Sequence, residues 1–147
     1  MGAMSIPDGQ LTPRFTAIAP KFIDAAWRDG AHLLAEACEK SAGEVTGDQL
    51  KMLLSRGERQ LLRVDTPSGA VGWIVISVQQ MPNMRALYVY AAQGPGAADV
   101  ESFAILRQIA QEEGCSAIRW SCGPGVQRLL AARHGAKAVY TVMEVEV

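Results

Sequence analysis

Three apolar segments in the middle of the chain most constrain the fold that this sequence can adopt. Residues 60–65, 70–80 and 86–92 read QLLRVD, AVGWIVISVQQ and ALYVYAA, and they are rich in valine, isoleucine, tryptophan and tyrosine. The segments between them, TPSG and MPNMR, carry the proline, glycine, asparagine and serine that favour turns. Because such short connections join antiparallel neighbours, we expect three consecutive strands of one sheet.

The part of the chain before these strands has mostly helical periodicity. Residues 14–19 alternate weakly, which predicts a short first strand. From 21 to 41, apolar residues recur at three- and four-residue spacing, which predicts a helix with Gly30 as the point where it would divide in two. Another helix is predicted over 46–57, because its first residue is a threonine followed three positions later by a glutamine, the pattern of a capping box.

The part after the three strands alternates between helix and strand. Apolar spacing predicts helices over 99–113 and 126–134, each followed by a glycine that ends it. A strand is predicted between them at 116–121, and a closing strand at 137–147, where apolar and polar residues alternate. A strand–helix–strand unit crosses over right-handedly, so 86–92 and 116–121 should be parallel neighbours.

These elements predict one α/β (α+β) domain over residues 4–147, with a mixed, mostly antiparallel central sheet of about six strands flanked by helices. Residues 1–3 precede a second methionine and look like the remnant of a cloning vector, so they are left out of the fold prediction.

Composition and charge argue against several classes of function. The formal net charge is -1 and the sequence pI is about 6.1, unlike the basic character of nucleic-acid-binding proteins. Cys38, Cys115 and Cys122 lack the spacing of a zinc site and are predicted to be free thiols in a reducing compartment. No apolar run approaches the ~20 residues of a membrane span, and no signal peptide is recognised, so a cytoplasmic location is predicted.

A loop of small residues, QGPGAA at 93–98, lies between the strand 86–92 and the helix 99–113. Backbone N–H groups at such a helix start, free of bulky side chains, suit a pyrophosphate, although a plain strand-to-helix turn would have the same composition. The element order and this loop resemble the GNAT superfamily of acyl-CoA N-acyltransferases over about residues 15–147. Members carry an Arg/Gln-x-x-Gly-x-Gly/Ala loop, whose defined positions are matched here by Gln93, Gly96 and Ala98.

The resemblance implies transfer of an acetyl or other acyl group from acetyl-CoA or another acyl-CoA to a primary amine of a small-molecule or protein acceptor. It implies that the strands 86–92 and 116–121 splay apart and that the coenzyme lies between them. The implied coenzyme-binding positions are strand residues with free main-chain groups and the loop residues: Val89, Ala91, Gln93, Gly94, Gly96, Ala97 and Ala98.

Several positions depart from the family pattern. Pro95 removes one donor from the loop, and Asp99 puts a carboxylate where a phosphate would lie. The tyrosine that commonly acts as general acid is replaced by Ala131, and the strand 86–92 has no carboxylate that could act as a base. The catalytic residues are therefore unknown from the sequence. Only one strand follows Gly135 where the family usually has two, so the sheet is one strand short or a second copy completes it as a homodimer.

Several residues with reactive or charged side chains also have simpler structural interpretations. Cys122 could be a nucleophile, but a small buried cysteine is favoured. Tyr88 and Tyr90 alternate onto one face and are predicted to line the core or a pocket. His134 is interpreted as a residue at a helix end and His32 as one on a helix flank. Surface positions are predicted for Arg128 and Arg133, and core positions for Trp27, Trp73 and Trp120.

A catalytically silent protein with the same fold is the alternative function. Small GNAT-like proteins encoded by tailed bacteriophages, some associated with virion assembly, are similar to this chain in their helical front end and in the ending RLLAARHGAKAVYT. Under that interpretation the chain would be a structural or interaction protein, since fold alone does not determine function.

Overall fold

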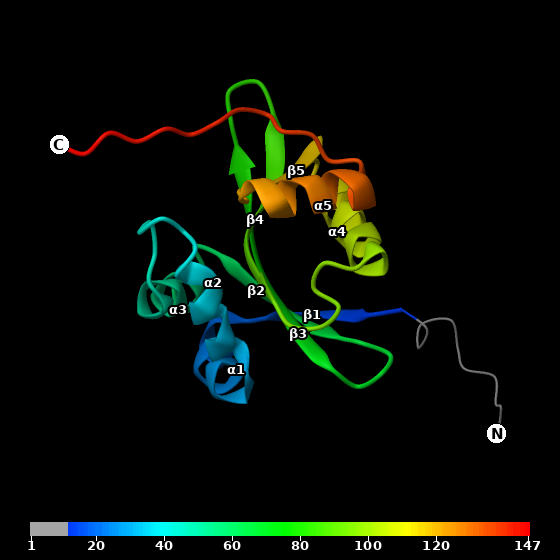
Figure 1. Cartoon of the computed structure of the whole chain (residues 1–147). Helices are drawn as coiled ribbons and strands as arrows, with labels where there is room; N and C mark the ends of the chain where they lie inside the picture. Colours follow the sequence, from blue (N-terminus) through cyan, green and yellow to red (C-terminus); the bar gives the residue numbers. More distant parts are fainter. Residues whose placement is uncertain (1–11) are drawn as a thin grey trace.

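The structure is a computed structural model that describes residues 12–147, and the predicted vector remnant at 1–3 lies outside the described residues. One five-stranded sheet in the order β1-β2-β3-β4-β5 forms its centre (Figure 1). The strands span Arg14–Ile18, Gln60–Asp65, Val71–Gln80, Arg85–Gln93 and Ala117–Trp120.

Neighbouring strands along the sheet are antiparallel from β1 to β4, whereas β5 runs parallel to β4. The three predicted antiparallel strands are therefore confirmed, as is the parallel pairing across the helical crossover. A mixed sheet with helices against it is also the fold class that the sequence predicts.

The helices lie where the apolar periodicity predicts them. They are α1 (Ile23–Asp29), α2 (Leu34–Cys38), α3 (Gly47–Ser55), α4 (Val100–Glu112) and α5 (Pro124–His134), with single 3-10 turns before α1 and α2. Gly30 divides the first predicted helix, and its φ of +138° is a conformation that glycine adopts readily. The capping box of α3 is present, because Thr46 Oγ1 accepts from Gln49 N at 3.2 Å and Gln49 Oε1 accepts from Thr46 N at 3.0 Å.

Each face of the sheet carries its own apolar core. Along β3, Trp73 and Val75 point to the face covered by α1, α2 and α3, whereas Ile74 and Ile76 point to the face covered by α4 (Figure 1). All four side chains are buried. Burial on both faces explains why this strand is apolar throughout and does not alternate with polar residues.

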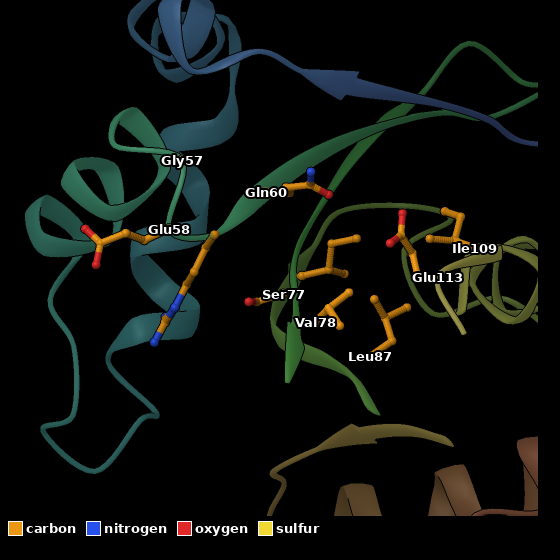
Figure 2. A pocket seen from close by; sticks show the side chains of 10 residues that line it. Gly57, Glu58, Gln60, Ser77, Val78, Leu87, Ile109 and Glu113 are labelled. Atoms are coloured by element: carbon orange, nitrogen blue, oxygen red, sulfur yellow. The ribbon is translucent and has the colours of Figure 1, made fainter. Parts of the chain in front are cut away.

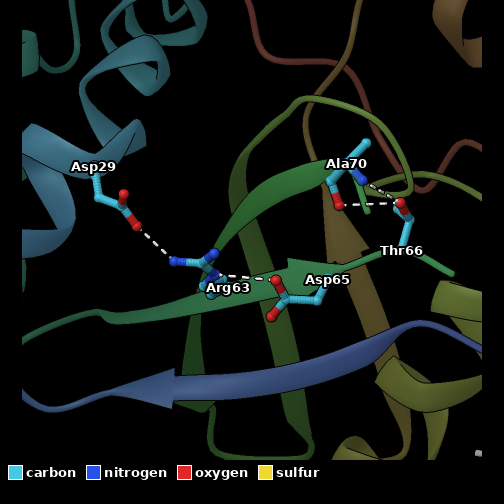
Figure 3. Close-up of polar contacts among 5 residues, drawn as sticks. All are labelled: Asp29, Arg63, Asp65, Thr66 and Ala70. Atoms are coloured by element: carbon cyan, nitrogen blue, oxygen red, sulfur yellow. Dashed lines mark hydrogen bonds and ion pairs between the residues drawn. The ribbon is translucent and has the colours of Figure 1, made fainter. Parts of the chain in front are cut away.

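An ion-pair network links α1 to the sheet. Arg63 on β2 contacts Asp29 at the end of α1, with 2.5 Å between Nη1 and Oδ2, and Asp65 two residues along its own strand, with 3.2 Å between Nε and Oδ1 (Figure 3). In the β2–β3 turn, Thr66 Oγ1 lies 3.0 Å from both the backbone N and O of Ala70. These bonds hold the turn in the conformation that the loop after β4 packs against.

The predicted closing strand at 137–147 does not form, so the sheet has five strands instead of about six. Large apolar side chains in this C-terminal segment are exposed, among them Val142 at 79% and Met143 at 88%. An alternating pattern makes a stable strand only when a neighbouring strand accepts its hydrogen bonds and one face is covered. Within residues 12–147 this segment has neither.

Candidate functional site

The sheet opens at the point where β4 continues beyond β5. The last pair between these strands is Val89 with Trp120, and β4 continues to Gln93. Tyr90 is the extra residue of a β-bulge, because Val89 pairs with Ile76 of β3 and Ala91 already pairs with the preceding Val75. β-bulges are frequent next to active sites, where they redirect side chains.

Two loop glycines after β4 adopt conformations that other residues avoid. Gly94 has a φ of +90° and Gly96 one of +81°. A Cβ at Gly94 would lie 2.8 Å from the carbonyl oxygen of Val71, and one at Gly96 would lie 2.6 Å from Cγ2 of Thr66. Close packing of the loop against the β2–β3 hairpin therefore explains both glycines without a ligand.

The start of α4 retains free hydrogen-bond donors. Asp99 is the N-cap residue, but its carboxylate accepts no hydrogen bond from the first turn of the helix. The N–H groups of Val100, Glu101 and Ser102, which have no partner within the helix, are thus not capped by this side chain. The buried Ser102 hydroxyl donates to the carbonyl of Gly96 and fixes the loop to the helix. The loop therefore presents the helix start in one defined position.

Three basic side chains gather beside this helix start, and sequence reasoning did not find them as a group. Arg133 and His134, at the end of α5, reach the carbonyl oxygen of Ala98, at 3.5 Å from Nη1 and 3.2 Å from Nε2. The His134 ring stacks on Phe103 with 4.0 Å between centroids, and Arg107 donates to the carbonyl of His134. Only the packing of α5 against α4 brings these basic side chains to the loop.

Two tyrosines of β4 lie near the opening, on the opposite face of the sheet. The ring centroids of Tyr88 and Tyr90 are 4.8 Å apart. The Tyr88 hydroxyl lies 2.6 Å from Oγ of Ser121, which directly follows β5. The Tyr90 hydroxyl accepts from Gln79, and the Arg59 guanidinium lies 3.6 Å from the centre of the Tyr90 ring. The Tyr88 hydroxyl thus links β4 to the residue after β5, close to the last residue pair of the two strands.

Solved structures that are similar to this chain include several acetyltransferases. A ribosomal-protein-alanine N-acetyltransferase from Brucella melitensis biovar Abortus 2308 is 14% identical, with a TM-score of 0.63 over 92% of this chain and 99% of that chain. An aminoglycoside N-acetyltransferase in complex with CoA is 11% identical, with a TM-score of 0.60 over 97% and 99%. An aminoglycoside acetyltransferase from an uncultured soil metagenomic sample, in complex with sisomicin, is 11% identical, with a TM-score of 0.61 over 92% and 97%.

The chain has the GNAT acetyltransferase fold. No protein-family model and no curated protein sequence matches it. Similarity at 11–14% identity establishes the arrangement of elements and not the chemistry, since one fold hosts many functions.

The predicted coenzyme positions are distributed unevenly around the opening of this GNAT fold. Val89 is still paired on both sides, with β3 and β5, whereas Ala91 lies beyond the last residue of β5. Gln93 ends β4, and Ala97 is buried at 8% exposure. The loop and the helix start therefore adjoin the opening, but the opening begins one residue after Val89.

Cys122 lies in an environment that the sequence did not predict, whereas His32 lies where it was predicted. Cys122 is exposed, so the prediction of a buried cysteine there is wrong, because the chain has already left the sheet at Trp120. Cys38 is the buried thiol, and burial raises its pKa, which disfavours the nucleophilic thiolate. His32 lies on a helix flank, as predicted, and its Nδ1 is 2.9 Å from the carbonyl oxygen of Trp27.

A hollow of about 220 Å³ lies away from the loop, between the start of β2 and the end of α4 (Figure 2). Leu87 and Ile109 contribute apolar surface, and Ser77 and Glu113 contribute polar groups. The loop at 93–98 adjoins the opposite end of α4, so this hollow is separate from the loop.

Two further searches of residues 12–147 give negative results. No cluster of three or more histidine, cysteine, aspartate or glutamate side chains is arranged to hold a metal ion. Among the helices of this range, none combines the length and the apolar character that crossing a membrane requires.

Proposed function

We propose that the chain is a GNAT-like N-acetyltransferase that transfers an acetyl or other acyl group from acyl-CoA to a primary amine. One observation carries the proposal: after a β-bulge, β4 extends beyond the end of β5 and leads directly into the glycine-containing loop and the uncapped start of α4. The solved acetyltransferases of the same fold support it, and one of them is in complex with CoA. The acceptor is a small molecule or a protein that carries an amine.

The residues around the helix start fit a phosphate group. Val100, Glu101 and Ser102 would donate their backbone N–H groups, and Gly94 and Gly96 shape the loop that leads to them. Arg133 and Arg107 supply the positive charge that the loop itself lacks. The carboxylate of Asp99 opposes an anion at this place, so the cations must outweigh it.

Tyr88 is the residue best placed to handle a proton. Its hydroxyl contacts Ser121 where β4 and β5 separate, and a hydroxyl there can protonate a leaving thiolate. Bound acyl-CoA supplies the activated thioester, and main-chain groups of β4 beyond Val89 would orient it. β4 carries no carboxylate, so the acceptor amine loses its proton to water. Three free cysteines agree with a cytoplasmic site of action.

A catalytically silent GNAT-fold protein, such as a phage-encoded virion-assembly or interaction protein, is the second candidate. Asp99 at the helix start and the absence of a carboxylate on β4 favour it. It predicts that no acyl-CoA binds, which separates it from the first candidate in one experiment.

Thermal unfolding with acetyl-CoA tests the proposal. At about 100 times its dissociation constant, acetyl-CoA should stabilise the protein by ~2.7 kcal/mol and raise the melting temperature by about 5–10 °C. Absence of a shift at millimolar ligand would exclude the transferase and leave the silent protein. Tyr88→Phe should then lower turnover without changing the shift, because it removes the proton and not the binding groups.

Two charge variants beside the loop provide a matched control. Arg133→Ala should weaken acetyl-CoA binding and Asp99→Asn should strengthen it, each about two- to fivefold, as expected for ~0.3–1 kcal/mol at a helix start. Changes in the same direction would contradict the assignment of this helix start. Gly96 is unsuitable for such a test, because a side chain there would collide with Thr66 and disturb the fold.

A further inference from the structure

Two arginines lie at the two ends of a row of side chains on the face of the sheet that α4 does not cover. Arg59 directly precedes β2, and its guanidinium lies 3.6 Å from the centre of the Tyr90 ring. Tyr90 contacts Tyr88, with 4.8 Å between the ring centroids. Arg119 of β5 is the register partner of Tyr88. The order across the face is therefore Arg59, Tyr90, Tyr88 and Arg119, a set called the tyrosine row below.

The pleat of the strands explains why these side chains share one face. In β5, Ile118 packs into the core on the α4 side, and Trp120 packs edge-on against Phe103 of α4. Arg119 lies between them in the strand and therefore points to the opposite face. Tyr90 packs against the core of that opposite face, which α1, α2 and α3 cover. All four members of the row are partly exposed, so a ligand can reach them.

The positive charge of the tyrosine row is not neutralised within the part of the chain that the structure describes. Neither Arg59 nor Arg119 makes an ion pair there. Glu58, the neighbour of Arg59 in the sequence, contacts Arg56 instead, with 3.7 Å between Nη1 and Oε2. Two half-buried guanidinium groups without a counter-charge favour an anionic ligand, and the planar fork of each matches the two oxygens of a carboxylate.

Hydrogen bonds hold the two rings of the row in place. Gln79 Nε2 donates to the Tyr90 hydroxyl at 2.9 Å, and the Tyr88 hydroxyl lies 2.6 Å from Oγ of Ser121. A ligand that binds beside rings already held in this way has less side-chain freedom to restrict, which favours binding. Tyr88 also lies one residue before the last pair of β4 and β5, so the row ends at the opening between these strands.

We propose that the acceptor of the acyl group is a small amine that also carries a carboxylate. The carboxylate binds at the tyrosine row, to the guanidinium groups of Arg59 and Arg119, and the amine points to the opening between β4 and β5. The inference rests on the proposed acyl transfer and adds the chemical class of its acceptor. A polyamine is disfavoured at the row, because guanidinium groups without a counter-charge repel further positive charge.

Matched acceptors test this class. Glycine, β-alanine and γ-aminobutyrate, each compared with its own amide, place the carboxylate at increasing distances from the amine. With acetyl-CoA as the donor, kcat/KM for the best acid should exceed that for its amide by about ten- to a hundredfold, as expected for charge-assisted hydrogen bonds to a carboxylate. Equal turnover of acid and amide, or a preference for spermidine or for phosphoethanolamine over the acids, would each overturn the carboxylate-bearing acceptor.

Two arginine variants and a matched control test the location of the carboxylate. Arg59→Gln and Arg119→Gln should each reduce the preference for acid over amide by about tenfold, mainly through KM, because the arginine holds the acid before and during the reaction. Arg56→Gln removes the same charge from an arginine that is already paired with Glu58, and should keep the preference. An equal reduction in Arg56→Gln would mean that net charge and not the tyrosine row sets the preference. Thermal unfolding without ligand checks that each variant is folded.

The thermal shift with acetyl-CoA separates a failure of this inference from a failure of the proposed function. No shift in the parent chain would exclude acyl transfer and this acceptor together. A shift with no turnover of any carboxylate-bearing amine would leave coenzyme binding in place and overturn the acceptor class alone. The two arginine variants should show the same shift as the parent chain, because the row lies on the face opposite to the start of α4.

Discussion

The two ends of the molecule differ sharply in how well they are packed. Up to Ala110, helices and strands bury a core on each face of the sheet, and side chains such as Leu34, Leu61 and Ile74 are fully buried. From residue 111 to 147 no side chain is buried, although this stretch contains β5, α5 and the valine-rich C-terminal segment 136–147, called the tail below. Apolar patterning therefore creates a core only where a second element lies against it.

The same contrast appears in two segments of similar sequence character. β2, which reads QLLRVD, and the tail both combine aliphatic residues with charged residues. β2 has β1 on one side and β3 on the other, whereas the tail has no strand beside it within residues 12–147. The difference is the availability of partners, and it predicts different costs for the same substitution at the two ends.

The largest expected effect comes from removing a leucine side chain in each region. Leu61→Ala in the fully buried core should lower the free energy of unfolding by ~2–5 kcal/mol, because it creates a cavity. Leu129→Ala on α5, where the leucine is 51% exposed, should cost less than ~1 kcal/mol. Urea denaturation at low protein concentration measures both, and equal losses would show that α5 is as well packed as the core.

Much of the fold could be predicted because local signals and tertiary packing agree. The turn residues between 60 and 92 set the meander, and the capping box of Thr46 sets the start of α3. The closing strand could not be predicted correctly, since alternation reports which residues suit a strand and not whether an edge receives it.

The site was only partly accessible from the sequence. The loop at 93–98 could be located by its small residues and by its position between strand and helix. The basic side chains beside it could not, because Arg133 and His134 are 35 and 36 residues away from Ala98 and reach it only through the packing of α5. The structural reason for Gly96 was also hidden, since the neighbour that requires a glycine there is Thr66 in the distant β2–β3 turn.

Replacing each of two glycines of similar conformation by alanine sharpens the comparison between the packed and the poorly packed end. Gly96 and Gly114 have φ of +81° and +73°, so an alanine costs each ~1–2 kcal/mol in backbone strain. A Cβ at Gly114 meets no atom within 4 Å, whereas at Gly96 it lies 2.6 Å from Cγ2 of Thr66. Gly96→Ala should therefore cost a further ~1–3 kcal/mol in the free energy of unfolding, because its neighbours are overpacked.

Thr66→Ser isolates the cause of that difference. Serine lacks the colliding methyl group but keeps the hydroxyl that bonds to Ala70. In a double-mutant cycle measured by urea denaturation, Gly96→Ala should lose its additional cost in the Thr66→Ser background. If the additional cost persists there, the collision is not its source.

The smallest expected effect is the pH dependence of one ion pair between α1 and α3. Asp24 Oδ1 lies 3.0 Å from Lys51 Nζ, and this hydrogen bond and the charge of Lys51 lower the Asp24 pKa from its ordinary value of 3.8. A lowered pKa in the folded state adds stability above pH 3.8 that is lost as the pH falls through the folded-state pKa. Asp24→Asn should thus be slightly less stable than the parent chain near neutral pH, with the difference vanishing in acid.

Glu144→Gln in the unpaired tail is the matched control and should leave the unfolding free energy of the monomer unchanged, because Glu144 makes no ion pair within the described residues. A difference between Asp24→Asn and the parent chain that persists below the folded-state pKa would mean that packing, and not charge, is what Asp24 contributes.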